Sequence, residues 1–326
     1  MGAKQAFLGA ALAGLLTVLC PWQFASAQLE APSGVTGFGD PSKIPSEDTL
    51  ETTYGLAMGS GARAGAVGTS ALAYNTSNMA AVPTYHVEAF SQIIPGSKSQ
   101  GGTYWTIGSS VTDSTTAKKI AMGTSFRGVF SGEDRRYSGW DWRSGIGIQA
   151  IPQIGIGIGF RWGRLGSDWS DVPCPSEDGN CPVRVGPSFD GITIDASMTV
   201  TPIPWLKVSG LGYNLVKTYS SIAPQMAGGS LALTPIDSLT IGGDVLVDFT
   251  SFEKNQIIAG GGLSYIAGEM VPLRFGYRRD NGRRLNQITA GAGFNKGKIG
   301  AEMALRQDIR GNKETYLLFM FRFVVE

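Results

Sequence analysis

The chain has 326 residues, of which 42% are hydrophobic and 16% charged, and its net charge at pH 7 is +1. This balance excludes intrinsic disorder, which combines low hydrophobicity with high net charge, and it gives no electrostatic reason to expect a nucleic-acid partner. The 46 glycines follow no Gly-X-Y repeat, which excludes collagen. The single histidine, His86, excludes zinc sites built on two histidines, and we expect neither metal nor cofactor.

Residues 1–27 have the features of a secretory signal peptide. Lys4 supplies the basic start, and the apolar run at 6–19 is too short to span a bilayer. The Ala-Ser-Ala sequence at 25–27 is a good cleavage site. The rival interpretation is a lipoprotein acylated at Cys20, but no small residue precedes that cysteine. We therefore expect export to the bacterial outer membrane.

Two cysteines remain after the expected cleavage, Cys174 and Cys181, and both lie in a loop rich in Pro, Asp and Gly. Because exported proteins enter an oxidising compartment, we expect a disulfide that closes a small surface loop. A metal site is the rival interpretation, and it lacks a nearby histidine.

The rest of the chain alternates with a period of two, in segments of about ten residues separated by turn residues, as membrane-spanning β-barrels do. In residues 154–163, three isoleucines, a phenylalanine and a tryptophan fall on one face, while four glycines and Arg161 fall on the other. Fourteen such segments are expected, at 84–93, 103–112, 119–130, 139–150, 154–163, 188–200, 204–217, 226–235, 238–249, 255–267, 270–279, 284–294, 297–308 and 314–325.

The predicted fold is all-β, a 14-stranded antiparallel transmembrane β-barrel over residues 84–326 with a short N-terminal plug or hatch segment. Tight connections follow the even-numbered strands, for example at Pro152-Gln153 and Pro202-Ile203, and mostly longer ones follow the odd-numbered strands. Bacterial barrels have short periplasmic turns and long outer loops, so both ends of the barrel are expected in the periplasm. Tryptophans near strand ends are expected at the membrane interfaces. A soluble β-sandwich is the rival fold.

A charged side chain that faces lipid is costly, so the alternation along each strand is expected to point the charged residues into the lumen. Mixed signs favour a salt-bridge network over a selective channel lining. His86 beside Glu88 is interpreted as a hydrogen-bonded lumenal pair; a Ser–His enzyme is the weaker reading because the sequence has no G-x-S-x-G motif. We expect no enzyme activity. The expected network comprises His86, Glu88, Arg127, Arg143, Arg161, Asp244, Asp248, Arg274, Arg278, Glu302, Arg306 and Arg322, with Asp141 and Asp195 also inward.

Residues 28–83 do not read as barrel strands, and we expect a periplasmic linker followed by an N-terminal hatch. Ser46-Glu47-Asp48 could cap a short helix running from Leu50 to Ala57. Residues 59–80 resemble the stretch G-A-R-A…G…A-S-A…Y-Y-N-P-A-G-L-A of FadL-type long-chain fatty acid transporters and the related PorV-like barrels. The matching residues are Gly61, Ala62, Arg63, Ala64, Gly68, Ser70, Ala71, Tyr74, Asn75 and Ala80.

The chain departs from the pattern at 76–78, where it has Thr, Ser and Asn in place of Pro, Ala and Gly. The resemblance implies a hatch seated inside the barrel, with Arg63, Tyr74, Asn75 and Asn78 as hatch or ligand-binding residues. A flexible leader without a gating role is the alternative.

The resemblance implies passage of hydrophobic, fatty-acid-like molecules through the outer membrane. A PorV-like barrel that acts as a scaffold or shuttle for secreted or envelope proteins is the alternative, and a passive porin is a third class. The expected partners are outer-membrane lipid, a hydrophobic small molecule or, in the alternative, a secreted or envelope protein.

Overall fold

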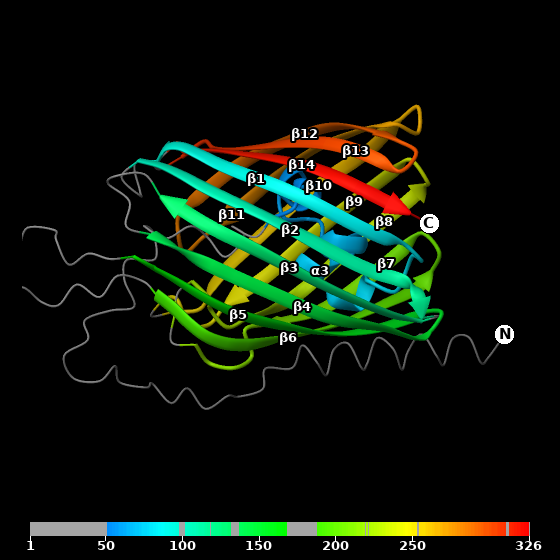
Figure 1. Cartoon of the computed structure of the whole chain (residues 1–326), viewed down its shortest axis with the longest axis horizontal. Helices are drawn as coiled ribbons and strands as arrows, with labels where there is room; N and C mark the ends of the chain where they lie inside the picture. Colours follow the sequence, from blue (N-terminus) through cyan, green and yellow to red (C-terminus); the bar gives the residue numbers. More distant parts are fainter. Residues whose placement is uncertain are drawn as a thin grey trace, which may run out of the picture.

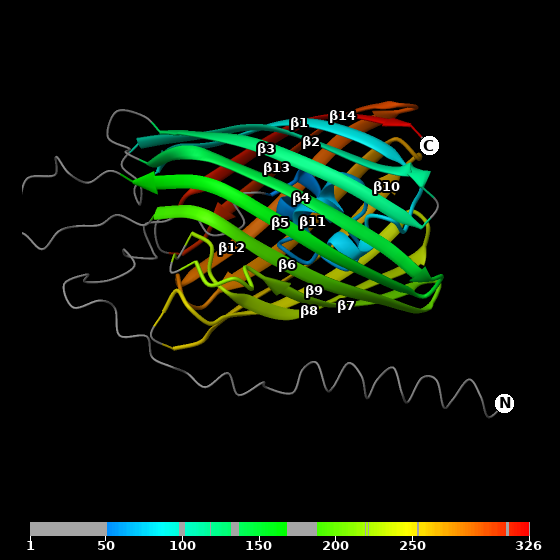
Figure 2. The same cartoon turned by 60° about the horizontal axis from the view of Figure 1, so that its bottom comes forward.

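The computed structural model describes residues 51–97, 102–117, 119–131, 137–167, 188–218, 220, 222–252, 254–310 and 313–325. Fourteen strands form one closed barrel, and each pairs with its neighbours in sequence order (Figures 1 and 2). The strands are β1 (Tyr85–Ser97), β2 (Gly102–Ala117), β3 (Ile120–Ser131), β4 (Tyr137–Ile151), β5 (Ile154–Ser167), β6 (Ser188–Ile203), β7 (Leu206–Tyr213), β8 (Met226–Ile236), β9 (Leu239–Asp248), β10 (Gln256–Ala267), β11 (Val271–Asp280), β12 (Leu285–Lys296), β13 (Ile299–Asp308) and β14 (Thr315–Val325).

The closing pair joins the first and last strands, with Tyr85 opposite Val325 and Ile93 opposite Leu317. All pairs are antiparallel, as consecutive strands joined by short connections require. The prediction of a 14-stranded antiparallel barrel is thereby confirmed.

The alternation along each strand separates an apolar outer face from a polar lumen. On β5, Ile156 and Ile158 are exposed on the outside, while Arg161 is buried inside. On β14, Phe321 is exposed outward, and its neighbour Met320 is buried. Such an outer belt is what a wall in contact with lipid requires. Among the described residues, no helix is long and apolar enough to cross a membrane.

The two ends of the barrel differ in their connections. We call the turn end the one where β1 begins and β14 ends; short turns join β4 to β5 and β10 to β11 there. The loop end is the opposite one. The expected turn at Pro202-Ile203 is wrong by two residues, because β6 continues through Ile203 and the turn is at 204–205.

Strand β7 is shorter than the sequence suggested. The prediction ran from 204 to 217, whereas β7 ends at Tyr213. Asn214 then takes a positive φ of 52° and is buried, and its backbone N–H donates to Asp195 at 2.7 Å. Two further apolar residues, Leu215 and Val216, follow and are exposed, and their apolar character extended the predicted segment beyond the strand.

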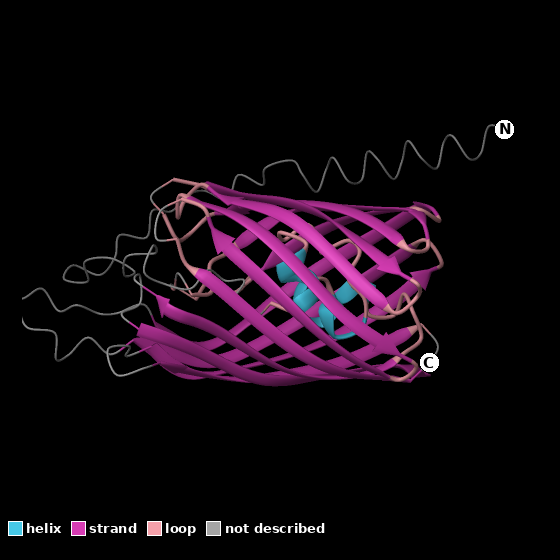
Figure 3. Ribbon diagram, turned by 90° about the horizontal axis from the view of Figure 1, so that it is seen from above, coloured by secondary structure: helices cyan, strands magenta, loops and turns pink. Residues whose placement is uncertain are grey.

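A plug segment, residues 51–83, lies inside the barrel (Figure 3). It contains α2 (Thr53–Ala57), α3 (Gly68–Tyr74) and the 3-10 turn η3 (Thr76–Asn78). The expected helix start at Ser46-Glu47-Asp48 is wrong for α2, because its N-cap is Thr52, whose side chain accepts from the Gly55 N–H at 3.3 Å. Residues 46–50 lie outside the described residues.

Candidate functional site

The plug segment is packed against the whole circumference of the barrel. Helix α2 contacts β11 to β14, α3 contacts β1 to β4, and η3 contacts β4 to β6. Backbone and side chains between α2 and α3 reach β8, β9 and β10, and Asn75 reaches β7 through Ser209. The segment therefore touches all fourteen strands.

Glycines of the wall let the plug backbone approach closely at two places. A side chain at any of them would overlap plug atoms, so the fit depends on hydrogen at these positions. The first place, the η3 seat, faces Thr76 and Ser77 and consists of Gly145, Gly147, Gly155 and Gly157 on β4 and β5. The second, the α2 seat, faces Met58, Gly59 and Gly61 and consists of Gly242, Gly260, Gly262 and Gly276 on β9 to β11.

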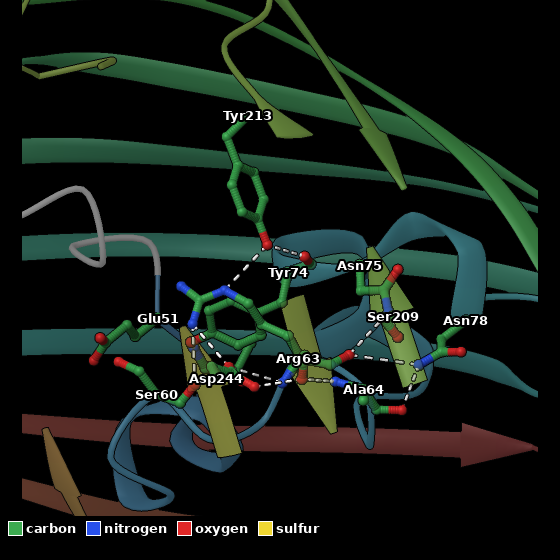
Figure 4. Close-up of polar contacts among 12 residues, drawn as sticks. Glu51, Ser60, Arg63, Ala64, Tyr74, Asn75, Asn78, Ser209, Tyr213 and Asp244 are labelled. Carbon is green, nitrogen blue, oxygen red and sulfur yellow. Dashed lines mark hydrogen bonds and ion pairs between the residues drawn. The ribbon is translucent and has the colours of Figure 1, made fainter. Parts of the chain in front are cut away.

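Arg63 is the centre of a buried cluster that joins the plug to the wall (Figure 4). Its Nη1 lies 2.9 Å from Asp244 Oδ2 on β9, and its Nε donates to the Tyr213 hydroxyl at 3.1 Å. The guanidinium also lies 5.5 Å from the centre of the Tyr74 ring. The Tyr213 hydroxyl in turn donates to the Tyr74 carbonyl. Two of the four expected hatch residues, Arg63 and Tyr74, thus meet the expected lumenal charge Asp244 here.

Asn75 connects the end of α3 to β6 and β7. Its Nδ2 lies 3.0 Å from each of three acceptors, the Arg63 carbonyl, Thr199 Oγ1 and Ser209 Oγ. Ser77 Oγ donates to Asn75 Oδ1 at 2.6 Å and lies 2.7 Å from Thr199 Oγ1. This neutral network can exchange partners among hydroxyls without separating charges.

Asn78 ties the plug to itself. Its Nδ2 donates to the Ala64 carbonyl at 2.7 Å and lies 3.5 Å from that of Arg63. The four residues named from the family-like stretch, Arg63, Tyr74, Asn75 and Asn78, are therefore brought together and buried.

Glu302 on β13 holds the start of α2. It pairs with Arg274 at 2.6 Å and Arg322 at 3.2 Å, and the Thr53 hydroxyl donates to it at 2.8 Å. The Arg274 guanidinium also lies 5.1 Å from the centre of the Tyr54 ring. Burial raises the pKa of the Tyr54 phenol to about 12, although the charge of Arg274 opposes this, so the hydroxyl keeps its proton at physiological pH.

Glu51, at the start of the described plug, forms an ion pair with Arg306 on β13. Both side chains are almost fully buried. Arg306 also stacks on Tyr316 of β14, with its guanidinium carbon 4.4 Å from the ring centre. Because Arg306 lies two residues from the loop end of β13, this pair fixes the plug's first residue near the loop end.

Asp141 on β4 lies among three arginines of the lumen. Arg161 and Arg127 approach it at 2.7 and 2.9 Å, and Arg143 at 3.9 Å. Arg143 also donates to the Ala73 carbonyl of the plug at 3.3 Å. Three of the arginines expected in the lumen thus surround one carboxylate.

The remaining lumenal charges are arranged locally. His86 Nε2 lies 3.1 Å from Glu88 Oε1, and the ring faces Gly68 at the start of α3. Asp248 accepts backbone N–H groups of the connection that follows β9. Arg278 lies 3.6 Å from Asp280, which Arg283 approaches at 3.1 Å. Among the described residues, no group of three or more His, Cys, Asp and Glu side chains could hold a metal ion.

Apolar side chains gather inside the loop end. They come from strands far apart in the sequence and, with Phe90 packed against them, form a cluster of residues at most 5% exposed. Ile222, from the connection that follows β7, turns inward to join them. At the loop end this cluster consists of Ile94, Tyr104, Val129, Leu165, Phe189, Ile222, Ala223, Tyr316 and Leu318.

The outer wall carries an aromatic group on β3 to β5. Trp140 and Trp162 meet edge to face with their centroids 4.9 Å apart. With Phe126 and Trp142 they line a shallow apolar hollow of about 430 Å³. Trp105, Trp162 and Trp205 are exposed on the outside, in the positions expected of interfacial tryptophans, whereas Trp169 lies outside the described residues.

Sequence reasoning missed several members of the site. Tyr213 fell on a strand and Glu51 in an expected helix, yet Tyr213 accepts from Arg63 of the plug and Glu51 pairs with Arg306 of the wall. Thr199 and Ser209 are ordinary inward positions, recognisable only once Asn75 is placed. The predicted disulfide partners, Cys174 and Cys181, lie outside the described residues.

Comparisons with known proteins find solved structures with a similar fold. No family model matches the sequence, and no curated protein matches it. Among solved structures, the toluene transporter TbuX of Ralstonia pickettii matches with a TM-score of 0.56 and 12% identity, covering 83% of this chain and 96% of that one. The CymD monoaromatic hydrocarbon channel matches with a TM-score of 0.60 and 11% identity, with the same coverage. A Pseudomonas aeruginosa FadL homologue matches with a TM-score of 0.53 and 10% identity, covering 86% of this chain and 98% of that one.

The chain has the FadL-type fold. The expected likeness to FadL-type barrels is thereby confirmed at the level of the fold, over most of the chain's length.

Proposed function

We propose that the protein is an outer-membrane channel for hydrophobic small molecules, held closed by its plug in the arrangement described. The observation that carries the proposal is the apolar cluster inside the loop end, above a plug tied to the wall by buried polar contacts. The outer apolar belt supports the location in a membrane.

A solute that enters from the outer side would meet the apolar cluster at the loop end first. Tyr104, Val129 and Phe189 face the lumen where a barrel wall otherwise carries polar side chains. Apolar pockets with a few polar groups are typical binding sites for small molecules. The lumen of a water-filled porin is lined by polar side chains instead.

Passage requires the plug to move. The plug touches every strand, and its seats are so close that no solute fits between plug and glycine. The plug is held by hydrogen bonds and ion pairs, and several of these groups have a second partner close by. Asp141 contacts two arginines, and Asn75 donates to two hydroxyl groups. A solute that binds better to a shifted plug would move this equilibrium.

The substrate class is proposed from two observations. Solved proteins of this fold are described as toluene transporters and as a monoaromatic hydrocarbon channel, which supports an apolar cargo. The lumen adds Arg161, stacked 4.8 Å from the Phe189 ring centre, and Arg306 on Tyr316. Arginine beside an apolar cluster suits a chain with an anionic end, so we favour fatty-acid-like amphiphiles.

Binding of radiolabelled oleate and of radiolabelled toluene to the detergent-folded protein tests this function. Phe189→Ala should weaken binding, whereas Ile192→Ala, on the outer face of the same strand, should leave it unchanged. Asn75→Ala should alter binding through the plug. Saturable binding of toluene alone would restrict the cargo to neutral hydrocarbons. Binding of neither ligand by a folded barrel would contradict the proposal and favour the PorV-like scaffold.

A further inference from the structure

An apolar hollow lies on the outer wall of the barrel, on the opposite face of the sheet from the plug. It has a volume of about 430 Å³ and is lined by Phe126, Trp140, Trp142 and Trp162. We call these four residues the aromatic hollow. They come from β3, β4 and β5, which pair with one another and lie side by side (Figure 2). The proposed channel function, which takes place in the lumen, makes no use of the aromatic hollow.

The walls of the aromatic hollow are fixed by contacts within the sheet. Trp142 lies opposite Phe126 in the strand register, and its Nε1 donates to Thr124 Oγ1 at 2.6 Å. The Phe126 and Trp140 rings are nearly parallel, with an angle of 20° and centroids 6.4 Å apart. On β3, Gly128 lies opposite Trp140 and carries no side chain that could cover this ring. The rings therefore form a concave apolar surface that exists before any ligand binds.

A charged pair lies next to the aromatic hollow, on its loop-end side. Arg164 of β5 lies opposite Trp140 in the register and two residues beyond Trp162, which is about 7 Å farther along the strand. Its Nε is 3.6 Å from Asp190 Oδ2, and the two side chains are 76% and 68% exposed. Much of the guanidinium is therefore open to a further partner. Because charges that face hydrocarbon are costly, this pair marks the level at which the wall leaves the apolar part of a membrane.

We propose that the aromatic hollow and Arg164 bind one anionic, phosphate-bearing membrane lipid. An acyl chain lies in the hollow, and the phosphate lies on the guanidinium. The purely aromatic lining on a wall that faces hydrocarbon selects an alkyl chain over a polar ligand. The arginine selects phosphate, with which a guanidinium forms two parallel charge-assisted hydrogen bonds. The proposal rests on the membrane location in the proposed function, but not on transport or on the plug.

The barrel also carries a matched arginine that lies away from the aromatic hollow. Arg279 on β11 is exposed, lies one residue from the loop end of its strand and donates from Nε to Asn281 Oδ1 at 2.8 Å. A lipid attracted by charge alone would gather at both arginines. A lipid that also needs the aromatic hollow should depend on Arg164 and not on Arg279.

Quenching of tryptophan fluorescence by brominated lipids tests the proposal. The reporter protein keeps Trp140, Trp142 and Trp162, and its four other tryptophans are replaced by Phe. A second reporter keeps only Trp205, which is 50% exposed at the turn end. Both are reconstituted in phosphatidylcholine bilayers that contain the same small share of dibromostearoyl phosphatidylglycerol or dibromostearoyl phosphatidylcholine.

We expect phosphatidylglycerol to quench the hollow reporter at a lower share than phosphatidylcholine does, and to show no such preference with the Trp205 reporter. In the hollow reporter, Arg164→Gln should reduce the preference about fivefold, the effect of about one basic residue on an anionic lipid. Asp190→Asn, which removes the competing carboxylate, should increase the preference, and Arg279→Gln should leave it unchanged. Trp140→Leu should weaken quenching by both lipids.

Equal quenching of the hollow reporter by the two lipids would overturn the proposal, and so would a preference that survives Arg164→Gln. A preference that Arg279→Gln removes to the same extent would show attraction by charge alone and would overturn it too. If neither lipid quenches either reporter, the wall is not in the bilayer, and the membrane location in the proposed function is wrong together with the lipid site.

Discussion

Arg63 of the plug and Asp244 of β9 form an ion pair at 2.9 Å in which the side chains are 4% and 2% exposed. The carboxylate also accepts the Arg63 backbone N–H at 3.3 Å and the Ser230 hydroxyl. This pair links a 33-residue plug segment to a strand that follows it by more than 150 residues, so the strength of the pair bears on whether the plug can leave.

Breaking this pair should destabilise the protein strongly. Arg63→Ala or Asp244→Ala leaves a buried charge without its partner, which costs about 3–5 kcal/mol of unfolding free energy. The double variant Arg63→Met/Asp244→Leu, which removes both charges, should lose less than either single variant. Urea unfolding in detergent, followed by tryptophan fluorescence, measures all three. Equal losses in the single and double variants would show that the charges do not act as a pair.

Side chains added at the glycine seats should displace the plug without harming the wall. Gly157→Val at the η3 seat and Gly260→Val at the α2 seat both overlap plug backbone. We expect larger and noisier ion conductance than wild type in planar bilayers. Gly210→Val on β7, where nothing lies within 4 Å of an added carbon, is the matched control. Conductance that stays at the wild-type level in the seat variants would mean that the plug does not depend on these glycines.

Asp141→Asn should lower the stability of the folded barrel far more than the loss of an exposed carboxylate does. It removes the negative charge between Arg127 and Arg161, both 1% exposed, and leaving buried charges uncompensated costs several kcal/mol. Asp190→Asn breaks the Arg164–Asp190 pair, whose side chains are 76% and 68% exposed, and should change little because solvent screens such pairs. Folded barrels migrate differently from the unfolded chain in gel electrophoresis. The temperature at which each variant changes to the migration of the unfolded chain measures this difference in stability.

Tyr213→Phe should loosen the plug while keeping the packing of the ring. The variant loses the hydroxyl that accepts from Arg63 Nε and donates to the Tyr74 carbonyl. Buried groups left without a partner cost about 1–3 kcal/mol. Tyr265→Phe, exposed on the outer face, is the control. A variant as stable as the control, by urea midpoint, would mean that water replaces the lost hydroxyl.

The strands could be predicted because their signal is local. The alternation of Ile156 and Ile158 with glycines, and the cost of a charge such as Arg161 in lipid, set the phase of β5 without knowledge of its neighbours. The same reasoning overran β7, because the exposed residues Leu215 and Val216 are also apolar although the strand has already ended.

The plug's attachments could not be predicted in this way. Asn75 meets Thr199 and Ser209, which lie 124 and 134 residues away, and Glu51 meets Arg306 at 255. Such partners depend on how the closed barrel brings distant strands around the segment. The family-like stretch indicated which plug residues matter, but nothing local indicated what they would contact.

The most direct test of the channel with a movable plug is uptake of radiolabelled oleate or toluene by cells producing a plug-to-wall disulfide. Thr76 Oγ1 and Ser197 Oγ lie 3.1 Å apart, a separation that suits cysteines in a Thr76→Cys/Ser197→Cys variant made in the Cys174→Ser/Cys181→Ser background. Uptake of at least one ligand should be blocked when this bond is oxidised and restored when it is reduced, with each single-cysteine variant unaffected. Uptake that is the same in the oxidised and reduced forms, or that never exceeds that of cells lacking the protein, would contradict the account.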